Sequence, residues 1–126
     1  MVAGKRVILI DDSLVRGTTS RRIIAQLRRA GASAVHMRVT APPFISPCYY
    51  GTDIDSSSGL IACGRGTEEI ARLIGADSLA FLSRDSVVRL AGKEEDGFCT
   101  ACFSGEYPTA IPKAGQKNQF ENNIHE

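Results

Sequence analysis

The sequence lacks a dominant charge, a long hydrophobic run and an export signal, and each absence disfavours a class of protein. Fifteen basic residues against fourteen acidic ones leave a formal net charge of +1, so nothing in the composition favours binding to nucleic acid. Val7-Ile8-Leu9-Ile10 is typical of its hydrophobic runs and is far shorter than the ~20 residues of a membrane-spanning helix. The N-terminus shows no basic start followed by an apolar stretch and a cleavage site. We therefore expect a cytoplasmic chain that binds neither membrane nor nucleic acid.

What the sequence does contain fits one globular domain. Hydrophobic residues make up 43% and charged residues 23% of 126 residues, which is enough for a single core. The chain has four cysteines, and in a reducing compartment thiols more often bind metal or do redox chemistry than form structural disulfides.

The first forty residues predict a strand, a helix and a second strand. Val7 to Ile10 is a β-branched run of the kind that is buried on both faces of a parallel sheet. A helix is expected from Thr18 or Thr19 to Ala30, and the alternation from Val35 to Val39 predicts the next strand. Strand, helix and strand in this order predict a parallel sheet and an α/β fold.

The second half predicts shorter elements after a long loop. Pro42 to Arg65 is rich in Pro, Gly, Asp and Ser, and so long a loop is expected to be held by something other than packing. Beyond it we expect a helix capped by Thr67, a strand near Leu79 and a helix capped by Ser83. Three apolar residues of the first of these helices are expected to face inward: Ile70, Leu73 and Ile74. Residues 1–112 form the expected folded part, and residues 113–126 a flexible tail.

The most informative segment runs from Asp11 to Thr19, between the first strand and the first helix. Open parallel sheets bind their ligands at the carboxyl ends of strands. Gly17 lets the backbone approach an anion, and hydroxyls and N–H groups at a helix start donate to phosphate oxygens. Asp11 and Asp12 suit sugar hydroxyls or a hydrated Mg²⁺. The pattern describes a ribose 5-phosphate site, while paired Asp residues alone also form plain turns and helix caps.

The cysteines leave several chemistries open. Cys99 and Cys102 form a Cys-x-x-Cys pair, and Cys48 and Cys63 complete a set of four. The spacing fits a zinc site, an iron–sulfur site, a redox pair or ordinary buried thiols, and it does not choose between zinc and iron.

A family resemblance narrows these alternatives. The string from Val7 to Thr19 closely resembles the phosphoribosyl pyrophosphate (PRPP) signature of type I phosphoribosyltransferases, and its continuation through Arg22 is similar to the glutamine PRPP amidotransferase family. The similarity extends through Pro47 to Gly51 and through Cys99 to Pro108, and in all spans about Gly4 to Ile111. It implies a partial type I phosphoribosyltransferase fold, with a parallel sheet, flanking helices and a cysteine-bearing C-terminal segment.

The resemblance also implies a reaction and roles for individual residues. The family displaces pyrophosphate from C1 of PRPP with glutamine-derived ammonia, giving 5-phosphoribosylamine for de novo purine synthesis. By resemblance, Asp11 and Asp12 would bind the ribose hydroxyls and Mg²⁺, and no catalytic residue is expected in this part of the family's chain. The residues implied for the 5-phosphate end of PRPP are Ser13, Val15, Arg16, Gly17, Thr18 and Thr19.

Cofactors and partners follow from the same resemblance. In one branch of the family, cysteines at the positions of Cys48, Cys99 and Cys102 hold a [4Fe–4S] cluster, with a fourth ligand upstream, whereas Cys63 matches no ligand position. The expected partners are PRPP, purine nucleotides as feedback inhibitors, the absent N-terminal glutaminase half and, at full length, further copies of the protein. Two alternatives remain: a noncatalytic PRPP- or nucleotide-binding module, and a structural domain held together by zinc.

Overall fold

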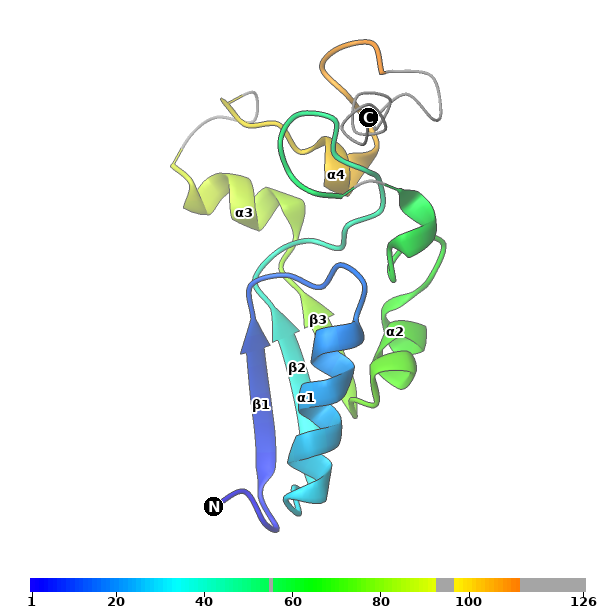
Figure 1. The fold of residues 1–126 in the computed structure, drawn as a ribbon. Coiled ribbons are helices and arrows are strands. Elements are labelled where there is room, and N and C mark those ends of the chain that lie inside the picture. The colour runs from blue at the N-terminus through cyan, green and yellow to red at the C-terminus, as the bar shows by residue number, and fades with distance from the viewer. Residues whose placement is uncertain (55, 93–96, 112–126) are drawn as a thin grey trace, which may run out of the picture.

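The fold is that of a computed structural model, and the structure describes residues 1–54, 56–92 and 97–111. The tail expected at residues 113–126 lies outside these ranges. Three strands form one parallel sheet in the order β1 (Arg6–Asp11), β2 (Ala34–Val39) and β3 (Ser78–Phe81). The helices are α1 (Thr18–Arg29), α2 (Thr67–Ile74), α3 (Arg84–Leu90) and α4 (Ala101–Ser104), with a short 3₁₀ turn at Ser57–Gly59. Figure 1 shows α1 and α2 beside the sheet, and α3 and α4 beyond the carboxyl ends of the strands.

The predicted α/β class and parallel sheet are confirmed, and one face of the sheet carries the core. Parallel pairing places Leu9 beside Met37 and Met37 beside Leu79, so their side chains share a face. Ile24 of α1 and Ile70 of α2 pack against this layer, and both are 1% exposed. The alternation predicted for the second strand is therefore the burial pattern of β2.

The prediction that Val7 to Ile10 are buried on both faces of the sheet is wrong for Ile8 and Ile10. Ile8 and Ile10 are 65% and 68% exposed. They lie on the face opposite α1 and α2, and in the described part of the chain no helix packs there. β1 is also an edge strand, because within the described residues it pairs with β2 alone.

The predicted helix ends are mostly confirmed, with two corrections in α2. The helix begins at Thr67, but the capping residue is Gly66. Leu73 is 46% exposed rather than facing inward, because Ile70 and Ile74, four residues apart, already fill the contact with the core. The Ser83 hydroxyl caps α3 as predicted by accepting a hydrogen bond from the Ser86 N–H at 3.2 Å.

Asp77 ties α1 to the start of β2. Its Oδ2 accepts hydrogen bonds from the Val35 N–H and from Arg28 Nη2, each at 2.6 Å. These bonds hold the pKa of Asp77 below its usual range, with the Val35 N–H contributing most.

Packing holds part of the long loop after β2. Phe44, Ile54 and Leu60 form a second buried cluster that also contacts Val15. The rings of Phe44 and Phe103 lie 4.8 Å apart, which joins the loop to α4. Among the described residues, none of the helices combines the length and apolar character needed to cross a bilayer.

Candidate functional site

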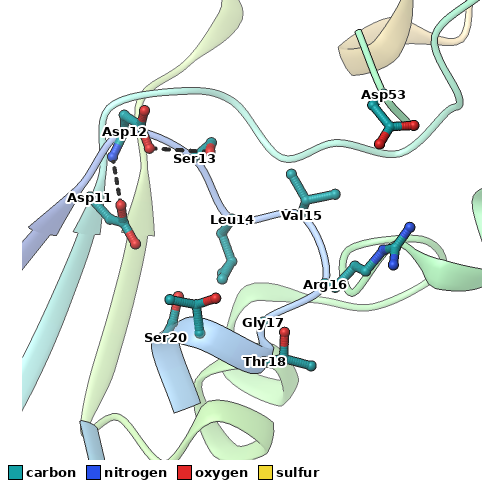
Figure 2. A pocket seen from close by; sticks show the side chains of 11 residues that line it. Asp11, Asp12, Ser13, Leu14, Val15, Arg16, Gly17, Thr18, Ser20 and Asp53 are labelled. Atoms are coloured by element: carbon teal, nitrogen blue, oxygen red, sulfur yellow. Dashed lines mark hydrogen bonds between the residues drawn. The ribbon is translucent and has the colours of Figure 1, made fainter. Parts of the chain in front are cut away.

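The predicted ligand loop forms one pocket at the carboxyl end of β1 and the amino end of α1. The pocket has a volume of about 450 Å³ and is lined by residues 11–20 together with Asp53. All eight residues expected to bind PRPP lie in this wall: Asp11, Asp12, Ser13, Val15, Arg16, Gly17, Thr18 and Thr19. Figure 2 shows how the labelled lining residues are arranged around the hollow.

The loop is anchored to the rest of the fold at three points. Leu14 is 1% exposed and belongs to the main core. The Ile61 N–H donates to the Val15 carbonyl at 2.9 Å, and the Thr40 N–H donates to the Asp11 carbonyl at 3.0 Å. The loop therefore has a defined shape while Thr18, Thr19 and Asp12 remain exposed to a ligand.

Gly17 also has a structural reason that the sequence alone does not reveal. Its φ of 76° lies in the left-handed region, which side chains rarely adopt. A Cβ at this position would lie 2.5 Å from Ile61 Cδ1 and 3.3 Å from Ile74 Cγ2. The side of Gly17 where a Cβ would stand therefore faces the core. The missing side chain lets the Ile61 side chain pack directly against the loop backbone.

Two carboxylates, those of Asp11 and Asp12, lie at one end of the pocket. The Asp12 N–H donates to Asp11 Oδ1 at 3.0 Å, and the Ser13 hydroxyl donates to Asp12 Oδ1 at 3.2 Å, as Figure 2 shows. Asp53 lies across the hollow from Asp11 and Asp12, on the loop that follows β2. The arrangement can accept hydrogen bonds from sugar hydroxyls or supply oxygen ligands to a divalent cation.

The other end of the pocket is the positive end of α1. Its capping residue is Gly17, and within the described residues no side chain caps the helix. Its first turn contains no acidic residue, so the helix dipole is not offset there. Thr18 and Thr19 add hydroxyl donors, and Arg16 adds a cation to the wall. This end suits an anion such as a phosphate group.

Sequence reasoning missed three lining residues: Leu14, Ser20 and Asp53. Leu14 and Val15 are two apolar residues between the polar segments Asp11–Ser13 and Arg16–Ser20. An apolar residue in such a place is a signal for a buried anchor. Asp53 carries no such signal. It reaches the pocket only because the Phe44 cluster folds its loop back over the site.

Three of the four cysteines line a second hollow of about 280 Å³. Cys48, Cys99 and Cys102 meet there with Tyr107, while Cys63 is exposed and lies elsewhere. The Ser46 and Ile45 N–H groups donate to the Cys102 carbonyl at 3.1 and 2.9 Å, which holds the two segments together.

The thiols of this hollow differ in acidity. Burial favours the neutral thiol of Cys48, but backbone N–H groups of Tyr50, Thr52 and Gly51 stabilise the thiolate and lower its pKa to about 7. Burial and the neighbouring charges of Cys48 and Cys99 raise the pKa of Cys102. N–H donors aimed at a sulfur suit a thiolate that binds metal. Across residues 1–54, 56–92 and 97–111, however, no three His, Cys, Asp or Glu side chains converge closely enough to hold a metal ion.

The fold and the pocket together define a class. The chain's parallel sheet, with an Asp-Asp loop that leads into a helix without a side-chain cap, resembles the phosphoribosyltransferase domain of solved PRPP amidotransferases. The chain superimposes with a TM-score of 0.82 and 48% identity on the glutamine PRPP amidotransferase from B. subtilis complexed with ADP and GMP, over 90% of this chain. It also matches the allosteric regulatory enzyme of purine biosynthesis, with a TM-score of 0.80 and 47% identity.

Sequence comparison finds relatives that share one name. The chain is 49% identical over 120 residues to amidophosphoribosyltransferase of Synechocystis, covering 95% of this chain. It is 50% identical over 115 residues to the enzyme of Bacillus subtilis, covering 88% of this chain. No protein-family model matches it. The chain is a homologue of the C-terminal part of the amidophosphoribosyltransferases.

The match covers only part of each relative. The chain spans 24% of the length of the Synechocystis and Bacillus subtilis proteins and 26% of the B. subtilis structure.

Proposed function

We propose that this chain is the PRPP-binding part of an amidophosphoribosyltransferase. In the proposed reaction, ammonia derived from glutamine attacks C1 of PRPP, the C1–oxygen bond to pyrophosphate breaks, and 5-phosphoribosylamine forms. The observation that carries the proposal is the single pocket that collects all eight expected residues between a carboxylate end and a helix start. The four free thiols of the described residues suit a cytoplasmic location, where thiols stay reduced.

The carboxylate end is assigned to the ribose. Asp11 and Asp12 would accept hydrogen bonds from the two ribose hydroxyls and would provide oxygen ligands for Mg²⁺. Asp53 lies on the opposite side of the same pocket and would be a further acceptor. When bound, the metal would neutralise charge on the pyrophosphate leaving group.

The helix end is assigned to the 5-phosphate. N–H groups at the start of α1 and the hydroxyls of Ser13, Thr18 and Thr19 donate to its oxygens. The transition state has positive charge on the ribose, so the main contribution of this segment is to hold the sugar in position while a nucleophile arrives.

Binding by charge-matched variants tests these roles. Ribose 5-phosphate added to the chain should shift the amide resonances from Ser13 to Thr19. Asp12→Asn should weaken Mg²⁺-dependent PRPP binding about tenfold or more, the effect of losing a charge-assisted contact, and should change binding of inorganic phosphate little. Asp85→Asn makes the same charge change on α3, away from the pocket, and should bind PRPP like the unsubstituted chain.

Two results would contradict the proposal. If no resonance between Ser13 and Thr19 responds to ribose 5-phosphate, the pocket is not the sugar-phosphate site. If Asp12→Asn weakens phosphate and PRPP binding equally, the division into a ribose end and a phosphate end is wrong.

We also propose that Cys48, Cys99 and Cys102 supply three ligands of a [4Fe–4S] cluster. The residues fit in type, because three thiols line one hollow and backbone N–H groups of Tyr50 and Thr52 lie 3.5 and 3.4 Å from the Cys48 sulfur. Such a cluster would join the loop after β2 to the C-terminal segment, and its fourth ligand would come from outside the matched region.

Regulation and assembly complete the proposal. The B. subtilis relative is described with ADP and GMP bound, which supports purine nucleotides as ligands of this chain. A nucleoside monophosphate carries the same ribose 5-phosphate group as PRPP, so the pocket of Asp11 to Ser20 can accept either. The full-length assembly is proposed to be a homo-oligomer that includes a glutaminase half.

A further inference from the structure

The third residue of α1 is a serine that is buried and yet lines the ligand pocket. Ser20 is 3% exposed, and among the residues that the structure describes it is the one polar residue so deeply buried. Its neighbours Thr18 and Thr19, which also line the pocket, are exposed. Figure 2 shows Ser20 on the first turn of α1, among the lining residues. A polar side chain is seldom buried unless a hydrogen bond satisfies it, so the partner of the Ser20 hydroxyl matters.

The Ser20 hydroxyl has no partner among the described residues. A serine inside a helix usually donates to the carbonyl four residues earlier or points to solvent. Ser20 makes neither that bond nor any other to a described group, and its low exposure rules out a side chain that points to solvent. The hydroxyl is not enclosed in the core either, because every fully enclosed side-chain oxygen or nitrogen of the described residues has a partner. The remaining direction is the pocket, which Ser20 lines.

The geometry of a helix start directs this hydroxyl. In an α-helix each Cα–Cβ bond tilts toward the amino end of the helix. The N–H groups of Thr18, Thr19 and Ser20 stand at that end and have no acceptor within the helix. The bonding between turns begins with the Arg21 N–H, which donates to the Gly17 carbonyl at 3.0 Å. An anion held by the free N–H groups would therefore lie on the side toward which the Ser20 side chain leans.

We propose that Ser20 is a further phosphate-binding residue, whose hydroxyl donates to an oxygen of the sugar 5-phosphate from the buried side of the pocket. The inference rests on the proposed function, because that function places the phosphate at the start of α1. The hydroxyl loses most of its water on folding, and a hydrogen bond is stronger where water is excluded. Ser20 therefore contributes more to phosphate binding than the exposed hydroxyls of Thr18 and Thr19, which keep their water in the free protein.

The same hydroxyl lowers stability in the absence of a ligand. It gives up hydrogen bonds to water when the chain folds and receives none from the described residues in return. Alanine differs from serine by this oxygen alone and is the better helix former. A structural role and a ligand-binding role therefore predict different effects of Ser20→Ala on stability. The structural role predicts a loss, and the ligand-binding role predicts no change or a gain.

Titration of the full chain tests the proposal. Isothermal titration calorimetry measures the binding of inorganic phosphate and of ribose 5-phosphate, which share the phosphate group. Ser20→Ala should weaken the binding of both by about tenfold or more, the effect of losing a hydrogen bond to a charged group. Urea unfolding without ligand should give Ser20→Ala a midpoint no lower than that of the unsubstituted chain, because no hydrogen bond within the protein is lost.

Ser86 provides the matched control. It is the third residue of α3, as Ser20 is of α1, but its hydroxyl accepts a hydrogen bond from the Ser83 hydroxyl at 2.8 Å and lies outside the pocket. Ser86→Ala should lower the urea midpoint, because it removes a bond made within the protein, and should bind both probes like the unsubstituted chain. A further measurement needs no substitution: inorganic phosphate should move the Cβ resonance of Ser20 and leave that of Ser86 in place.

The proposal is overturned if Ser20→Ala binds both probes as tightly as the unsubstituted chain. It is overturned equally if Ser20→Ala lowers the urea midpoint as Ser86→Ala does, since Ser20 would then be structural, or if phosphate leaves the Ser20 Cβ resonance in place. In each of these cases, amide shifts from Ser13 to Thr19 with ribose 5-phosphate would still support the proposed function. A chain that binds no ribose 5-phosphate would overturn both.

Discussion

Replacing Gly17 by alanine should destabilise the chain for two separable reasons. The left-handed backbone at φ 76° costs a residue with a side chain about 1–2 kcal/mol. The new Cβ would also lie 2.5 Å from Ile61 Cδ1, and overpacking of this kind costs about 1–3 kcal/mol. We therefore expect Gly17→Ala to lower the free energy of unfolding by about 2–5 kcal/mol.

Gly64 provides the matched control. Its φ is 71°, but a Cβ there meets nothing within 4 Å, so Gly64→Ala should lose only the backbone contribution of about 1–2 kcal/mol. The difference between the two variants isolates the contact with Ile61. Urea unfolding at one fixed protein concentration measures it, and a difference of this size should move the midpoint by on the order of 1 M.

A second substitution checks the cause. Ile61→Val removes the Cδ1 atom nearest to the new methyl group and by itself costs about 0.5–1.5 kcal/mol. Combined with Gly17→Ala, it should restore part of the lost stability instead of adding to the loss. Equal destabilisation by Gly17→Ala and Gly64→Ala, or simple additivity with Ile61→Val, would refute the packing argument.

Three further outcomes are expected. Folding lowers the pKa of Asp77 from its ordinary value of 3.8, so the ionised carboxylate stabilises the protein at pH values above 3.8 and stabilises it less as the pH falls below 3.8. Asp77→Asn should therefore lower the urea midpoint at pH 7, and the effect should become smaller in acid. After metal is removed with a chelator, iodoacetamide should label Cys48 half-maximally near pH 7 and Cys102 only at higher pH, because it reacts with the thiolate. Peptide mass spectrometry measures the labelling, and equal pH profiles for the two residues would contradict the difference in their pKa values. Anaerobic reconstitution should give a labile, substoichiometric iron–sulfur cluster, which Cys99→Ser should abolish and Cys63→Ser should leave unchanged. A stoichiometric, air-stable cluster that is lost in Cys63→Ser would instead make Cys63 the fourth ligand.

Local patterns predicted the elements that build the site. The apolar run before Asp11, the polar loop and the amphipathic stretch ending near Ala30 depend on neighbours within a few residues, and β1, the loop and α1 follow them. Ser83 was likewise predictable, because a capping hydroxyl acts within one helical turn.

Contacts between distant segments were not predictable in this way. Leu73 fits the apolar stripe of α2 as well as Ile74 does, and only the position of the core distinguishes them. Part of the need for glycine at Gly17 comes from Ile61, which lies far along the chain. Asp53 enters the pocket because its loop packs through Phe44, and neither residue has a local pattern that predicts this contact.

The loop from Asp12 to Gly17 is shaped before any ligand arrives, because Leu14 is buried and the Val15 carbonyl is bonded to Ile61. Fixing the backbone of one residue costs about 1–2 kcal/mol in conformational entropy, so a loose loop of this length would forfeit about 6–12 kcal/mol on binding. A micromolar dissociation constant corresponds to about 8 kcal/mol, so such a loss would consume most of a sugar phosphate's affinity. Since folding has already met that entropic cost, a few hydrogen bonds to a small, strongly hydrated ligand are enough to hold it.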